Sequence, residues 1–120
     1  MTIVFVIVPR AKNEQEREEF FKSLEYSHAG EVPYQLFEGN PENSGFDIRI
    51  TLPDDCIVLG NSWDKHIKYV LENGLPQHGK GRGFVPTWEG YVQGKMLLQS
   101  RRPPEGVFPD LKVELPEIAK

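Results

Sequence analysis

The chain has 120 residues, of which 38% are hydrophobic and 27% are charged, and its formal net charge is −4. This length and composition fit one domain spanning residues 1–120 and exclude a chain that is disordered throughout. The single cysteine, Cys56, excludes an intrachain disulfide and favours a reducing, cytoplasmic location. The apolar start lacks a basic region and a small-residue cleavage site, so we expect no signal peptide, and we expect no membrane partner.

Charge is distributed unevenly along the chain. Residues 1–60 contain 5 Lys/Arg against 11 Asp/Glu, whereas residues 61–120 contain 9 against 7. Between residues 65 and 102 the count is 7 basic to 2 acidic. Because the chain as a whole is acidic, this basic stretch does not by itself predict nucleic acid as the partner.

Residues 2–8 carry no charge, are rich in β-branched side chains and end at Pro9. Such a run is too short to span a membrane and is typical of a strand that is buried on both faces. We therefore expect it in the middle of a sheet. Its second face needs cover, which could come from Val107 and Phe108 or from a second copy of the chain in a homodimer.

A helix is predicted over residues 14–26. Asn13 can cap its first turn, and Glu16 stands three residues later as the partner of a capping box. The junction before this helix contains no glycine, and acidic residues fill the first turns. It is therefore neither a P-loop nor a dinucleotide-binding turn, although it occupies the place of one.

Three further strands are predicted over residues 32–38, 46–52 and 56–59, where apolar side chains alternate or form short runs. The second of these alternates without a slip, with Arg49 and Thr51 on the face that points away from the core. Short connections predict that the three strands form an antiparallel meander.

A second helix is predicted over residues 63–73, with Gly74 ending it. A third begins after Thr87, because four large apolar residues follow at helical spacing, namely Trp88, Tyr91, Val92 and Met96. Gly90 and Gly94 weaken this third helix, so a strand or an irregular segment remains an alternative there.

The last strand is predicted over residues 111–115, where apolar and charged residues alternate as in an edge strand. The resulting order is β-α-β-β-β-α-α-β. We therefore predict an α+β fold with a mixed or antiparallel sheet of four to five strands and two to three helices on one face. A ferredoxin-like sandwich is the alternative.

The best candidate site is the segment around His78, Lys80 and Arg82, in which three glycines alternate with these residues. Glycines let backbone N–H groups approach a ligand, and the cations suit phosphate or carboxylate. His78 is the candidate acid or base, and Trp88 and Tyr91 directly after the segment could stack on a base. The alternatives are a solvated surface loop for the segment and a core position for the two aromatic residues.

Other reactive side chains have plainer interpretations. Cys56 lies between two aspartates and an apolar run, which predicts a buried structural thiol with a raised pKa. Asp54 and Asp55 suit a turn between two strands. Ser62 and Lys65 have the spacing of a serine nucleophile and its base, but a helix cap explains Ser62. The three histidines share no ligand spacing, so we expect neither a metal nor a cofactor.

No local spacing assembles a nucleophile, a base and an orienting group. The sequence therefore favours a small binding or interaction module without catalytic activity of its own, whose partner is a protein or a small anionic ligand. The alternative is a small enzyme or nucleotide-binding domain that acts on a phosphorylated or otherwise anionic substrate through residues 78–88.

Overall fold

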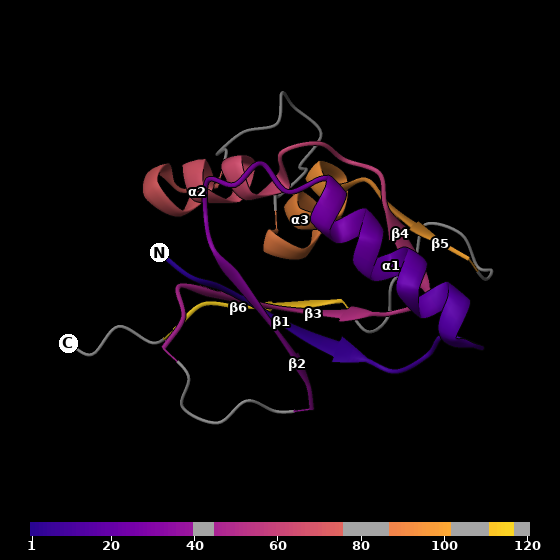
Figure 1. Ribbon diagram of the computed structural model, residues 1–120. Helices are drawn as coiled ribbons and strands as arrows, with labels where there is room; N and C mark the ends of the chain where they lie inside the picture. The colour runs from indigo at the N-terminus through magenta and orange to yellow at the C-terminus, as the bar shows by residue number, and fades with distance from the viewer. Residues whose placement is uncertain (40–44, 76–86, 102–110, 117–120) are drawn as a thin grey trace.

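The computed structural model describes residues 1–39, 45–75, 87–101 and 111–116. A mixed four-stranded sheet, in the order β2-β1-β3-β6, carries helices α1, α2 and α3 on one side (Figure 1). This confirms the predicted α+β class and the placement of the helices. The elements are β1 (Ile3–Val8), α1 (Glu14–Tyr26), β2 (Tyr34–Glu38), β3 (Ile48–Pro53), β4 (Cys56–Val58), α2 (Trp63–Asn73), α3 (Trp88–Met96), β5 (Leu98–Ser100) and β6 (Lys112–Glu114).

Strand β1 lies between β2 and β3, as its apolar sequence predicts. Ile3, Phe5 and Ile7 point into the core with the helices, and each is at most 2% exposed. Val4 on the opposite face is also fully buried. A strand without polar side chains is most stable in this central position, because both of its faces leave water.

The predicted antiparallel meander is wrong. Strand β1 pairs in parallel with both β2 and β3, so these two strands are not neighbours. Helix α1 provides the crossover that joins β1 to β2 in parallel. Because these two strands are adjacent, the sheet has the open βαβ arrangement and not the split one of a ferredoxin-like sandwich.

Strand β4 does not extend the main sheet. It pairs in antiparallel with β5 in a separate two-stranded sheet, and β5 was not predicted from the sequence. The main sheet ends instead at β6, which pairs in antiparallel with β3. The prediction of an edge strand near the C-terminus is thus confirmed.

The N-terminal caps predicted for α1 and α3 are confirmed. Asn13 Oδ1 accepts a hydrogen bond from the Glu16 amide at 3.0 Å, and Thr87 Oγ1 accepts one from the Gly90 amide at 3.0 Å. Ser62 differs from its prediction. It precedes α2 with a left-handed backbone (φ 60°), and its hydroxyl makes no capping bond. No helix among the described residues is long and apolar enough to cross a membrane.

Trp63 joins the helices to the sheet. Its ring meets Phe5 edge-on with centroids 5.2 Å apart and Tyr34 with centroids 5.3 Å apart. Its indole N–H donates to the Leu24 carbonyl at 3.1 Å and to Ser27 Oγ at 3.0 Å. The side chain is fully buried, so this donor needs a partner inside the protein, and the end of α1 provides it.

Candidate functional site

The structure describes only part of the predicted site. His78, Lys80 and Arg82 lie outside the described residues. Trp88 and Tyr91 lie in the first turns of α3, and their rings meet edge-on with centroids 6.5 Å apart. Both side chains are half-buried, and Trp88 packs against the core.

Tyr91 belongs to an exposed groove as well as to the helix packing. Its hydroxyl donates to the His66 carbonyl of α2 at 3.3 Å, which fixes the ring direction. Burial raises the pKa of Tyr91, so the phenol keeps its proton at neutral pH. Lys95 Nζ lies 5.7 Å from the centre of the same ring, within cation–π range.

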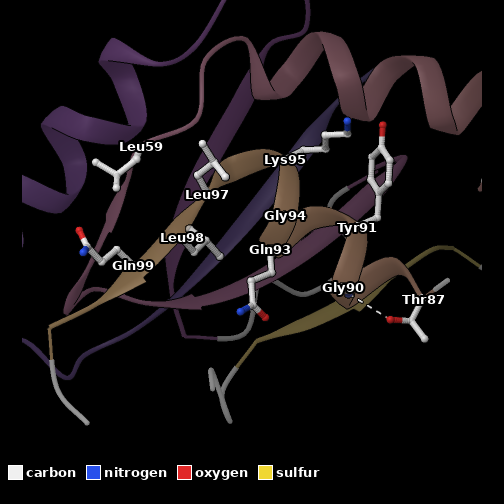
Figure 2. A pocket seen from close by; sticks show the side chains of 10 residues that line it. All are labelled: Leu59, Thr87, Gly90, Tyr91, Gln93, Gly94, Lys95, Leu97, Leu98 and Gln99. Atoms are coloured by element: carbon white, nitrogen blue, oxygen red, sulfur yellow. Dashed lines mark hydrogen bonds between the residues drawn. The ribbon is translucent and has the colours of Figure 1, made fainter. Parts of the chain in front are cut away.

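The groove runs along the outer face of α3 and over β5, and its volume is about 870 Å³ (Figure 2). Leu59 and Leu97 are its most exposed apolar side chains, at 57% and 56% exposure. Their segments lie together because the Gly60 amide donates to the Met96 carbonyl at 2.7 Å. Its lining residues are Leu59, Thr87, Gly90, Tyr91, Gln93, Gly94, Lys95, Leu97, Leu98 and Gln99.

Three features set the chemistry of this groove. Its floor includes Gly90 and Gly94, one helical turn apart, where the helix has no side chain of its own. Lys95 is the only charged residue among those that line it, so no described lining residue opposes an anion. Leu97 ends α3 with a left-handed backbone (φ 49°), a conformation that helices usually give to glycine at this position.

A second candidate position is the edge where the parallel strands β1 and β3 end, because open α/β sheets bind ligands there. In this protein the carboxylate of Asp54 occupies that position. Its Oδ1 accepts hydrogen bonds from the amides of Arg10 and Ala11, each at 2.7 Å, and its Oδ2 lies 3.6 Å from Arg17 Nε. Asp54 is 2% exposed. The amides that would cradle a phosphate in this type of fold therefore bind the protein's own carboxylate.

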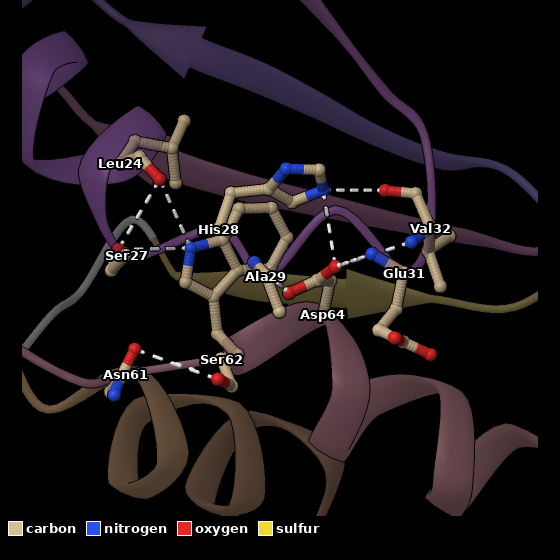
Figure 3. A network of polar contacts seen from close by, with 10 residues as sticks. Leu24, Ser27, His28, Ala29, Glu31, Val32, Asn61, Ser62 and Asp64 are labelled. Atoms are coloured by element: carbon tan, nitrogen blue, oxygen red, sulfur yellow. Dashed lines mark hydrogen bonds and ion pairs between the residues drawn. The ribbon is translucent and has the colours of Figure 1, made fainter.

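A polar network joins α2 to the segment that follows α1 (Figure 3). At its centre, the fully buried Asp64 accepts hydrogen bonds from the amides of Ala29 at 2.7 Å, Glu31 at 2.7 Å and Val32 at 3.2 Å. His28 Nε2 lies 3.2 Å from Asp64 Oδ2 and 2.6 Å from the Val32 carbonyl. Both neighbours of Nε2 are acceptors, so this nitrogen carries the hydrogen.

The Asp64 network is a structural clamp. Burial by itself would raise the pKa of Asp64, but the three amides and His28 outweigh burial, and the pKa lies below its ordinary value. The carboxylate is fully buried, and both of its oxygens accept hydrogen bonds from backbone amides. Sequence reasoning missed this residue, because an aspartate in the first turn of a helix is already explained by the helix dipole.

Neither the cysteine nor a metal centre provides a reactive site among the described residues. Cys56 is fully buried, and burial together with Asp55 and Asp54 raises the pKa of its thiol to about 12. This confirms the predicted buried thiol and removes it as a nucleophile. Within the described ranges, no group of three His, Cys, Asp or Glu side chains is placed to hold a metal ion.

Comparison with protein families, with curated proteins and with solved structures finds no match for this chain.

Proposed function

We propose that this chain is a small binding module and that the groove along α3 and β5 takes an apolar segment of a partner protein. The observation that supports this most is the pair Leu59 and Leu97, both more than half exposed beside the glycine floor. Contiguous apolar side chains exposed on one surface are typical of interaction sites.

Leu97 gives a second line of support. A left-handed backbone costs a residue with a side chain roughly 1 kcal/mol, and glycine would avoid most of this cost. A leucine in this position is thus less favourable than glycine for the backbone, and more than half of the residue stays exposed in the isolated chain. Strain of this kind is often retained at binding sites.

The shape of the groove favours a protein segment over a compact ligand. At Gly94 the floor has open space above it, because a side chain added there would meet no atom within 4 Å. The backbone or a large apolar side chain of a partner can therefore approach α3 closely. With Lys95 as the charged lining residue, we expect the partner segment to carry an acidic residue beside its apolar ones.

A library of random 12-residue peptides displayed on phage provides a probe for this proposal. Selection against the full chain should enrich peptides that combine apolar residues with an acidic one. The selected peptides should lose at least about tenfold in affinity for the Leu97→Gly variant, which removes the exposed side chain. Its melting temperature should equal or exceed that of the wild type, because glycine suits the left-handed position.

Tyr26→Asp is the matched control, since Tyr26 is 92% exposed on α1 and does not line the groove. This variant should bind the selected peptides as the wild type does. Failure to enrich any peptide, or equal affinity for wild type and Leu97→Gly, contradicts the proposal. The double variant Lys80→Ala/Arg82→Ala should also bind the peptides normally. A different result would favour the alternative of an anionic substrate: the wild type binds ATP or inorganic phosphate, and the double variant does not.

A further inference from the structure

Strand β2 forms one edge of the main sheet. It pairs with β1 on one side, and no strand in the described part of the chain pairs with its other side. The strand order β2-β1-β3-β6 places β2 at one end of the sheet. This edge lies in a different sheet from the groove residues of β5, so it is a separate surface.

The parallel pairing shows which backbone groups of β2 face outward. The Ile3 amide donates to the Pro33 carbonyl at 3.2 Å, and Ile3 stands opposite Tyr34. In a parallel ladder, a residue forms its backbone hydrogen bonds with the two residues that flank the one opposite it. Leu36 stands opposite Phe5, so the flanking Gln35 and Phe37 turn their backbone groups toward β1. The amides and carbonyls of Tyr34, Leu36 and Glu38 therefore point away from the sheet.

Among the described residues, this edge has little of the protection that exposed edges carry in other proteins, because Glu38 is its one charged residue. Its five residues, Tyr34 to Glu38, include neither proline nor lysine, and Leu36 in the middle is 41% exposed. The opposite edge differs. Strand β6 has three residues, and two of them are the charged Lys112 and Glu114.

The geometry points to a second copy of this chain as the partner of β2, paired in antiparallel about a two-fold axis at Leu36. In that register Leu36 meets Leu36 of the second copy, and both exposed side chains leave water. Glu38 comes opposite Tyr34 of the second copy, so no like charges face each other and a phenol faces a carboxylate. The three outward residues of each copy then satisfy one another's backbone groups in one continuous sheet.

The electrostatics of the edge agree with a symmetric partner. Glu38 already pairs with Arg17 of α1, which also lies near Asp54, so a cation stands beside the Glu38 carboxylate before association. Burial first, then the charges of Glu25 and Asp64, raise the pKa of Tyr34, which keeps this phenol a hydrogen-bond donor at neutral pH. Any shift of the register by two residues removes the Glu38–Tyr34 contacts and leaves fewer paired residues.

Cross-linking through Leu36→Cys tests this pairing in the full chain. Opposed residues of a hydrogen-bonded antiparallel pair have Cα atoms about 5.5 Å apart, within the range of a disulfide. Mild oxidation at micromolar concentration should give a covalent dimer on a non-reducing gel. Cys56 does not interfere, because it is fully buried. Leu115→Cys is the control: Leu115 is 44% exposed beyond β6 at the other edge, so this variant should give no covalent dimer on the gel.

A second variant tests the equilibrium without a covalent bond. Sedimentation equilibrium should show a monomer–dimer association for the wild type, and Leu36→Lys should raise its dissociation constant by at least about tenfold, since two ammonium groups would meet on the axis. Leu115→Lys should leave the constant unchanged. A wild type that stays monomeric at every concentration, equal oxidation of the two cysteine variants, or a dimer indifferent to Leu36→Lys overturns the inference.

Discussion

Replacing Asp64 with alanine should destabilise the fold by about 4–5 kcal/mol. The carboxylate accepts three amide hydrogen bonds, and bonds to a charged acceptor contribute roughly 1.5 kcal/mol each at the lower end of their range. The lower end applies because Ala29 and Glu31 are exposed, so water can reach their amides once the carboxylate is gone. In the variant, only the Val32 amide would be left without a partner, because Val32 is a buried residue.

Urea unfolding, monitored by tryptophan fluorescence, measures this loss. The urea concentration at the midpoint should fall, while the dependence of the unfolding free energy on urea concentration should stay constant. Asp47→Ala is the control: Asp47 accepts one bond from the Thr2 amide at 2.7 Å on an exposed surface, and its loss should cost less than about 1 kcal/mol. A free energy of unfolding for Asp64→Ala within about 0.5 kcal/mol of the wild type would refute the clamp.

The pH dependence of unfolding tests the same site independently. Because the pKa of Asp64 is lower in the folded protein than its ordinary value of 3.8, the ionised clamp contributes its full stability above that value. This contribution is lost as the pH falls below 3.8 toward the folded pKa. Asp64→Asn cannot titrate, so the stability gap between it and the wild type should shrink between pH 6 and pH 3. A gap that stays constant would contradict the assigned pKa direction.

Two further predictions concern packing and reactivity. In Gly60→Ala the new Cβ would lie 2.2 Å from the Lys95 carbonyl oxygen, so we expect a loss of about 2–3 kcal/mol in urea unfolding, whereas Gly94→Ala, with open space around it, should gain about 0.5–1 kcal/mol. If the two substitutions have the same effect, the close packing at Gly60 is wrong. Because the pKa of Cys56 is about 12, its thiol should not react with a disulfide reagent at pH 8 in the folded protein and should react fully in urea. Reaction at equal rates in the two states would show that the thiol is accessible.

The local elements followed closely from the sequence, because their signals are short-range. The predicted bounds of the helices at residues 14–26 and 63–73 coincide with α1 and α2. Periodicity placed Val92 and Met96 on the buried face of α3 despite its two glycines. These features depend on caps and on apolar spacing within a few residues.

Strand pairing and the two carboxylate sites did not follow, because they depend on residues far apart in the chain. The sequence suggested a meander from short connections, yet β1 separates β2 from β3. Asp54 was correctly placed in a turn, but its hydrogen bonds to the amides of Arg10 and Ala11 span more than 40 residues. The groove is likewise formed by Leu59 and Leu97 from separate segments.

The sequence by itself determined which segment occupies the middle of the sheet, since residues 3–8 have no polar side chain to present to water. It also determined where the first two helices begin and end. Only the tertiary structure decided which strands flank that segment, which amides the buried carboxylates bind, and which apolar side chains stay exposed. Chain folding brings these groups together by packing the whole core at once, and no local stretch of sequence encodes that outcome separately.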